Sequence, residues 1–392
     1  MPRHQREPGL LPRPLAVLAG LALVAATVVA VRLLPPASAV ATSSPPAPPA
    51  SRAAPLGLHT PALSAAVAEA PPPGFMRPGL VGPATVGPGF VGYVDTAADP
   101  AFDLPATALR TGVLHYLLGH LVAGGADGCS PAWASAGGTL IDPGVNQVAN
   151  RIGRLRALGG DAAPSFGGGS GGGDGSGGGD GSGGGDGSGS GSGDGSGGAG
   201  GADPAARCTE PRALAAAYRR VVGAFDVSAV DFELPAEGES AATAARRARA
   251  LRVLQREREL QVSFTAPLTA SGLGASCVAA LRAAHRAGAE VGTVNLLAGL
   301  EPRTAPSGRL SRLADAVRLA EAQIARAQSL PDEEDAWRRV ALTLVLADGS
   351  ELSEQDARTL SDYAVRHGLA WLSLRGADPD EGAATVLRGS VP

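Results

Sequence analysis

The residues best suited to chemistry lie in the stretch AVDFELPAEGES, positions 229–240. Asp231 and Glu233 alternate along a short apolar run, and a β-strand turns every second side chain to the same face, so both carboxylates are expected to point one way. Carboxylates that share a cavity can act as general acid and base. Position 235, the next on this face, is a proline, which has no proton to donate and removes a ladder hydrogen bond. We therefore expect the strand to end there.

The next acidic residue whose side chain would point to the same face of a regular strand is Glu237. On a regular strand it would lie about 6.6 Å beyond position 235, so only a bulge or a looped insertion of two residues would bring it back. An acidic residue at the start of a loop is more commonly a solvated carboxylate. Asp231 is interpreted as a structural inward carboxylate, because a buried carboxylate must find hydrogen-bond partners.

Around this stretch, apolar strands alternate with amphipathic helices about eight times. Each strand is apolar enough to be buried on both faces, which is typical of a parallel β/α architecture. We predict a closed (β/α)8 TIM barrel, with a doubly wound open sheet as the alternative. The expected strands are 89–96, 112–123, 163–169, 229–234, 260–268, 291–300, 338–348 and 369–377.

The N-terminus has the pattern of an export segment. Arginines precede an apolar run near positions 14–31, and Arg32 follows it. The run is long for a signal-peptide core and slightly short for a membrane span, so cleavage and anchoring both remain open. We predict a signal peptide or membrane anchor at 1–34, a Pro/Ala-rich disordered linker at 35–87 and the barrel at 88–392. The domain would then be extracellular on the cell membrane, or secreted.

A Gly/Ser/Asp-rich tract interrupts the predicted barrel at 167–203. Its six-residue repeat has no apolar position, so it cannot pack as a calcium-binding roll, and we interpret it as a disordered insertion. It follows the third predicted strand and would hang from the face of the barrel where active sites form.

Three cysteines in an exported chain suggest one disulfide and one spare thiol. Cys129 and Cys208 lie in loop-like sequence, and Cys277 opens an apparent helix, so we favour a Cys129–Cys208 bond, although sequence alone leaves all three pairings open.

The net charge of -4 gives no reason to propose a nucleic-acid partner. His115 and His120 are spaced to face opposite sides of one strand and are interpreted as buried or partly buried residues. No zinc spacing or phosphate loop occurs, and we expect no metal or cofactor.

The order of several stretches resembles glycoside hydrolase family 18, in particular the secreted chitinase-like proteins of actinobacteria. The matching stretches are GYVD, GCSPAW, SFGG (165–168), CTEPRALAAAYRRVV, VDFEL, VSFTAPL, VNLLA and GLAWLSL. Within them, the resemblance makes five residues substrate-binding candidates: Tyr93, Ser165, Asn295, Trp371 and Arg375.

In that family the fourth strand carries D-x-x-D-x-D-x-E, whose last glutamate is the general acid. Here Ser228, Asp231, Glu233 and Pro235 occupy the four positions, so the resemblance implies a damaged catalytic motif. Glu233 or Glu237 would have to serve as a displaced acid.

Two further departures count against catalysis. Leu300 and Glu301 stand where the family has an Asp and a Tyr that hold the sugar. On the last strand Trp371 is retained, but Arg375 lies at the later position, where the family has an aromatic floor.

We therefore expect a chitinase-like domain that binds N-acetylglucosamine-containing glycan, such as chitin, or a protein partner, without efficient hydrolysis. Two alternatives remain: an active chitinase or endo-N-acetylglucosaminidase that uses Glu237, and a structural envelope protein.

Overall fold

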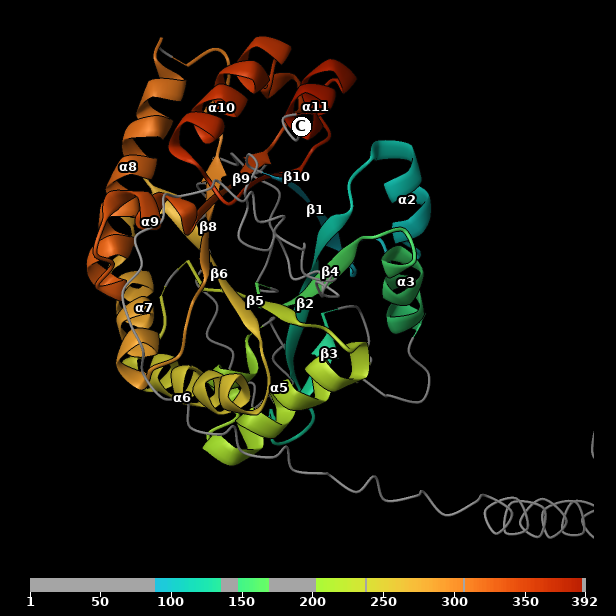
Figure 1. Cartoon of the computed structure of the whole chain (residues 1–392), viewed down its shortest axis with the longest axis vertical. Helices are drawn as coiled ribbons and strands as arrows, with labels where there is room; N and C mark the ends of the chain where they lie inside the picture. The colour runs from blue at the N-terminus through green and yellow to red at the C-terminus, as the bar shows by residue number, and fades with distance from the viewer. Residues whose placement is uncertain (1–88, 135–146, 169–201, 237, 306, 390–392) are drawn as a thin grey trace, which may run out of the picture. The chain divides into compact units, whose positions relative to one another are not determined.

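The computed structural model describes residues 89–134, 147–168, 202–236, 238–305 and 307–389, all within the unit Pro73–Pro392. Eight parallel strands form a closed barrel, because the first pairs with both the second and the last (Figure 1). The predicted (β/α)8 barrel is confirmed, and the open sheet is excluded. In order around the barrel the strands are β1 (Gly89–Asp95), β2 (His115–Gly124), β4 (Asp161–Gly167), β5 (Ala229–Glu233), β6 (Gln261–Thr269), β8 (Thr293–Gly299), β9 (Val340–Leu346) and β10 (Trp371–Gly376).

Helices cover the outside of the barrel and begin at recognisable caps. Ser353 and Asp356 form a reciprocal capping box at one helix start, and Glu210 with Pro211 begins another. The helices are α2 (Leu104–Thr111), α3 (Gln147–Arg156), α4 (Pro204–Arg207), α5 (Pro211–Phe225), α6 (Ala241–Glu257), α7 (Ala275–Ala287), α8 (Arg309–Gln328), α9 (Glu333–Arg338), α10 (Glu354–His367) and α11 (Glu381–Arg388), with a short 3-10 turn at Gly349–Glu351.

The inside of the barrel has an apolar layer at the N-terminal ends of the strands and a polar layer above it. Trp371 fills the apolar layer because three of its neighbours there are alanines: Ala163, Ala229 and Ala341. The polar layer consists of buried hydroxyl, amide and carboxyl side chains, where a TIM barrel more often has branched aliphatic ones. This polar layer forms the floor of the candidate site.

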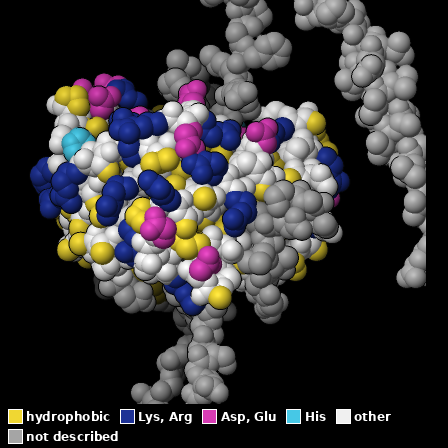
Figure 2. All heavy atoms as spheres, turned by 90° about the horizontal axis from the view of Figure 1, so that it is seen from below, with side chains coloured by type: hydrophobic (Ala, Val, Ile, Leu, Met, Phe, Trp, Pro, Cys, Tyr) yellow, Lys and Arg dark blue, Asp and Glu magenta, His cyan; other side chains and the backbone are white. Residues whose placement is uncertain are grey.

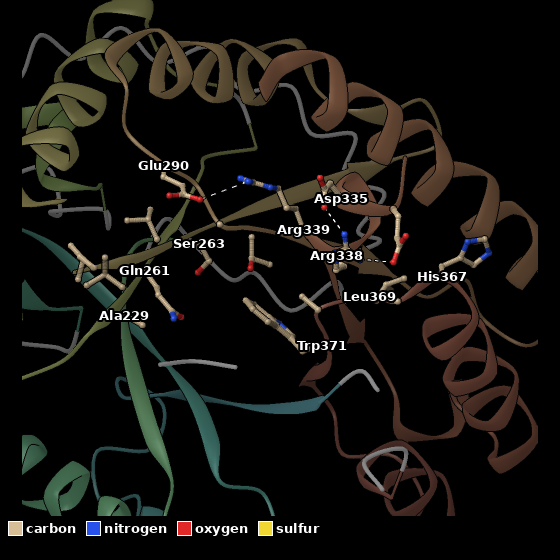
Figure 3. A pocket seen from close by; sticks show the side chains of 18 of the residues that line it. Ala229, Gln261, Ser263, Glu290, Asp335, Arg338, Arg339, His367, Leu369 and Trp371 are labelled. Atoms are coloured by element: carbon tan, nitrogen blue, oxygen red, sulfur yellow. Dashed lines mark hydrogen bonds and ion pairs between the residues drawn. The ribbon is translucent and has the colours of Figure 1, made fainter. Parts of the chain in front are cut away.

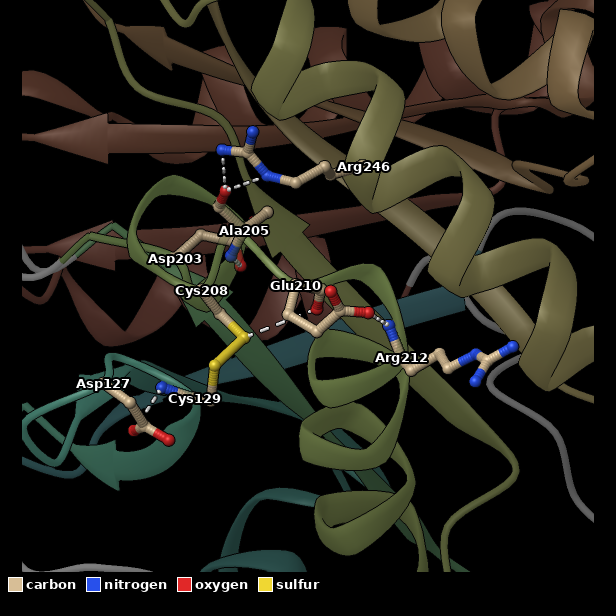
Figure 4. The surroundings of a disulfide bond; sticks show 8 residues. All are labelled: Asp127, Cys129, Asp203, Ala205, Cys208, Glu210, Arg212 and Arg246. Carbon is tan, nitrogen blue, oxygen red and sulfur yellow. Dashed lines mark hydrogen bonds between the residues drawn. A yellow bond between two sulfur atoms is a disulfide. The ribbon is translucent and has the colours of Figure 1, made fainter.

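Two short strands extend beyond the barrel: β3 (Ser130–Trp133), antiparallel to β2, and β7 (Gly272–Leu273), antiparallel to β6. The turn into β3 carries Cys129, which is bonded to Cys208 just after α4 (Figure 4). Cys277 is free and buried. The expected disulfide and the spare thiol are both confirmed.

Several predictions fall on residues outside the described ranges: the N-terminal segment, the Pro/Ala-rich linker, Glu237 and most of the glycine-rich tract. The described ends of the predicted insertion belong to the barrel, since Gly167 ends β4 and Asp203 is buried at the start of α4. Within the part of the chain that the structure describes, no helix has the length and apolar character needed to span a bilayer.

Candidate functional site

Polar side chains from strands all around the barrel converge at the C-terminal mouth. This is the face on which TIM-barrel enzymes build their active sites. The structure brings together six predicted site residues here: Tyr93, Ser165, Asp231, Glu233, Asn295 and Arg375. Leu117, Thr265, Leu297 and Thr343 complete the lining of the small cavity that they share.

Asp231 is buried on the floor of the site, with 1% of its surface exposed. Its carboxylate accepts hydrogen bonds from Ser165 Oγ (2.6 Å), Ser263 Oγ (2.6 Å) and Thr265 Oγ1 (2.9 Å). Burial raises the pKa of Asp231 to about 6, although the three hydroxyl donors pull it down. The predicted role of Asp231, an inward carboxylate satisfied inside the barrel, matches this arrangement.

A directional chain of hydrogen bonds continues from Asp231 across the floor. Thr343 Oγ1 donates to Asn295 Oδ1 (2.9 Å), and Asn295 Nδ2 donates to Thr265 Oγ1 (3.1 Å). Thr265 in turn donates to Asp231, so the amide of Asn295 orients the hydroxyl that faces the carboxylate. Asn295 therefore lies in the floor with both ends of its side chain occupied.

Glu233 lies one step above Asp231 on β5 and is paired with Arg375. Arg375 Nη1 donates to Glu233 Oε2 at 2.8 Å, and the guanidinium carbon lies 4.4 Å from the centre of the Tyr93 ring. Burial alone would raise the pKa of Glu233, but the hydrogen bond from His120 and the charge of Arg375 outweigh it and hold the pKa below its ordinary value. Glu233 is therefore ionised at neutral pH.

His120 Nε2 occupies the centre of this group. It lies 2.6 Å from Tyr93 Oη, 3.1 Å from Glu233 Oε2 and 3.2 Å from Arg375 Nη2. A single ring nitrogen carries at most one hydrogen. In the tautomer that carries hydrogen on Nε2, this nitrogen can donate to Glu233 or Tyr93; in the other tautomer it can accept from Tyr93 or Arg375. The proton on His120 thus decides which neighbour it binds.

Two glycines let the backbone pass close to these groups. A Cβ added at Gly168 would lie 2.6 Å from the Glu233 carboxyl carbon, and one at Gly119 would lie 2.4 Å from Tyr93 Oη. Gly168 also has a positive φ of 70°. Position 168 therefore has both a conformational and a steric need for glycine, and the predicted SFGG signature at 165–168 coincides with it.

Arg375 reaches across the barrel mouth. In the strand order, β10 and β5 are four places apart in either direction, so the Arg375–Glu233 pair joins opposite walls. Beneath it, only about 10 Å³ is open to the centre of a water molecule, room for about one water. A sugar ring cannot occupy the floor while Arg375 holds this position.

Trp371 is not part of this site. It lies at the start of β10, in the apolar layer, and lines a hollow of about 900 Å³ at the N-terminal ends of the strands (Figure 3). Ion pairs such as Glu290 with Arg339 and Asp335 with Arg338 border that hollow. It is far larger than the cavity at the mouth, but the convergent polar side chains lie at the mouth, on the face where this fold carries its chemistry. We therefore place the candidate site at the mouth.

The positions that resemble the sugar-holding Asp and Tyr lie away from the cavity. Leu300 is buried, and Glu301 is exposed and pairs with Arg312 on α8. Pro235 follows the end of β5, so the strand ends where predicted. Glu237, the candidate displaced acid, lies outside the described residues.

His120 was missed as a site residue because of a register shift. β2 and β4 change register between Leu118 and Leu121, so the alternation counted from His115 does not hold at His120. Ser263, Thr265 and Thr343 could have been predicted as site residues: each is a hydroxyl residue at an alternate position in an otherwise apolar strand.

Among the described residues, no group of three or more His, Cys, Asp or Glu side chains could hold a metal ion.

Comparison with known proteins supports a chitinase-like fold. The chain is similar to active domain 2 of a chitinase from Pyrococcus furiosus, with a TM-score of 0.59 and 21% identity over 78% of this chain and 96% of that one. A structure of the Pyrococcus furiosus domain complexed with chito-oligosaccharides matches with a TM-score of 0.59 and 20% identity over the same shares. A glycoside hydrolase family 18 chitinase from Pseudoalteromonas aurantia matches with a TM-score of 0.49 and 11% identity, over 77% of this chain and 99% of that one.

The chain thus has the fold of the Pyrococcus furiosus chitinase domain. No family model matches it, and no curated protein does.

Proposed function

We propose that this chain is a chitinase-like domain that binds N-acetylglucosamine-containing glycan at the barrel mouth without efficient hydrolysis. The Arg375–Glu233 ion pair is the observation that carries the proposal. A general acid must hold a proton at its working pH, and Arg375 together with His120 keeps Glu233 ionised. Position 235, where the resemblance puts the acid, is a proline.

Asp231 does not replace the missing acid. Its two oxygens are occupied by three hydroxyl donors, and it lies on the floor beneath Glu233, almost without exposure. A group that protonates a glycosidic oxygen must come within hydrogen-bond reach of it, about 3 Å. The cavity above Asp231 is too small for a sugar ring to provide that contact.

Binding is supported by the polar mouth and by the similar domain crystallised with chito-oligosaccharides. In this proposal the glycan approaches from the loop side, and Arg375, stacked on Tyr93, must move aside before a sugar ring can reach the floor. We also propose that the domain works outside the cell, secreted or anchored through the arginine-flanked apolar run near the N-terminus.

The test is to incubate the purified chain with fluorogenic chitobiose and chitotriose substrates and, in parallel, with chitin. We expect binding to chitin without turnover. Turnover that is lost in Glu237→Gln, but kept in the control Glu259→Gln, would overturn the proposal in favour of a relocated acid. Absence of both binding and turnover would favour the structural or protein-partner alternative.

A further inference from the structure

Three neighbouring helices on one side of the barrel, α5, α6 and α7, carry an unusual charge. Together they contain ten arginines and one acidic residue, Glu257, a net charge of +9 on a chain whose total is -4. α6 contacts both α5 and α7, so the three form one continuous face, which we call the arginine face. Figure 2 views the molecule from the side of α5 and α6 and shows arginine side chains spread over it, with a few Asp and Glu side chains among them.

Most of this charge is not neutralised. Among the described residues, only two of the ten arginines pair with carboxylates: Arg219 with Glu257, and the buried Arg247 with Asp203 and Glu239. The other eight have no ion pair with any described carboxylate: Arg212, Arg220, Arg246, Arg249, Arg252, Arg256, Arg282 and Arg286.

The chain contains no lysine, so arginine is used at every such basic position. This preference for arginine does not explain why the arginines of the arginine face lack acidic partners. On α8, which packs beside α7, and on α10, arginines have acidic neighbours three or four residues away: Arg318 pairs with Asp315, and Arg358 with Glu354. Four of the six arginines on α8 and α10 pair with a described carboxylate, against two of the ten on the arginine face. A free positive face raises the local concentration of anions and speeds their association.

We infer that the arginine face binds a flexible, linear phosphodiester polymer of the cell envelope, of the poly(glycerol phosphate) type. Guanidinium groups bind phosphates through paired hydrogen bonds. The three helices follow the curve of the barrel, and a flexible chain can follow a convex surface that a flat bilayer meets only along a line.

Single-stranded nucleic acid fits this face less well, because its binding uses aromatic side chains as stacking platforms. The aromatic residues of the three helices, Tyr218 and Phe225, are both buried. The inference rests on the charge of this face and on the proposed export of the domain; it does not depend on glycan binding at the mouth, so the two can fail separately.

The test compares two charge-reversed triples of the full chain. Arg220→Glu/Arg249→Glu/Arg282→Glu changes one exposed mid-helix arginine on each helix of the face. Arg303→Glu/Arg326→Glu/Arg366→Glu is the matched control: it changes three exposed arginines outside the face and shifts the net charge equally. Circular dichroism and thermal melting verify that both are folded.

Binding to a synthetic poly(glycerol phosphate) oligomer is measured for each protein. We expect wild-type affinity to fall at least about tenfold between low and physiological salt, because each phosphate contact releases counterions. The face triple should lose at least about tenfold in affinity. The control triple should lose less than about threefold, because salt screens the interaction of the polymer with charges that lie more than a Debye length away. No wild-type binding, equal losses in both triples, or tighter binding to single-stranded DNA would overturn the inference.

Discussion

Arg375, at the end of β10, donates from Nη1 to Glu233 Oε2 across 2.8 Å and so closes the barrel mouth from opposite walls. Both side chains are largely buried, with 21% and 12% of their surfaces exposed. At this depth, loss of either partner leaves a charge that water reaches poorly, whereas loss of both does not.

A double-mutant cycle tests this dependence. Arg375→Met and Glu233→Gln should each lower the free energy of unfolding by about 3 kcal/mol, and the double variant should lose clearly less than their sum. Urea unfolding provides the measurement. The exposed pair Arg318–Asp315 is the control, for which Arg318→Met should cost less than about 1 kcal/mol. Additive losses at positions 375 and 233 would contradict a coupled pair.

Glycan affinity should rise when the mouth is opened. Arg375→Ala removes the side chain that spans the cavity, so chitotriose should bind at least about tenfold more tightly, a gain of about 1.4 kcal/mol. Arg375→Lys keeps the charge and most of the length, and should stay near wild type. Calorimetric titration measures both variants. Weaker binding by Arg375→Ala would instead show that Arg375 itself holds the glycan.

Asp231 should make stability depend on pH in a direction unusual for a carboxylate. Its pKa is about 6 in the folded chain and lies near 3.8 for an ordinary Asp, so the folded state binds the proton more tightly. Stability from protonated Asp231 is fully present below about pH 4 and is lost as the pH rises through 6. The shift corresponds to roughly 3 kcal/mol.

Asp231→Asn should therefore flatten the stability profile between about pH 4 and 6.5. Denaturant unfolding over this range gives the comparison, and the exposed Asp362→Asn is the control, expected to follow wild type. A wild-type-like slope in Asp231→Asn would mean that another group controls stability in this window.

The disulfide should stabilise the barrel considerably. Cys129 and Cys208 are separated by 79 positions, and closure of a loop of that length in the unfolded chain corresponds to about 4 kcal/mol. Cys129→Ala/Cys208→Ala should accordingly lower the melting temperature by several degrees or more. Cys277→Ala, which removes a buried free thiol, is the control for the loss of cysteine as such. Equal melting of the wild type with and without reductant would contradict this prediction.

Part of this structure follows directly from the sequence. The eight barrel strands were predictable because each is an apolar run buried on both faces and separated from the next by an amphipathic helix. Asp231 and Glu233 were assigned to the inward face by simple alternation. Arg247 could also have been recognised as buried, because it falls on the helix face that carries Ala244, Ala248 and Leu251.

The rest depends on contacts between distant parts of the chain. Arg375 and Glu233 are 142 positions apart, and no local pattern pairs them. His120 reaches the site only through a shift in strand register, which alternation cannot reveal. The resemblance predicts Trp371 at the site. It lies instead in the apolar layer beneath the site, where three alanines leave the space that its side chain fills.

The two ends of the glycine-rich tract are held firmly at the barrel. Gly168 passes against the Glu233 carboxylate, and Asp203 binds Arg247 Nε (2.5 Å) and Tyr218 Oη (2.8 Å). The entropy cost of closing a loop between fixed ends grows only slowly with the length of the loop. A variant with whole GGGDGS units added or removed is therefore expected to keep the barrel and its mouth unchanged.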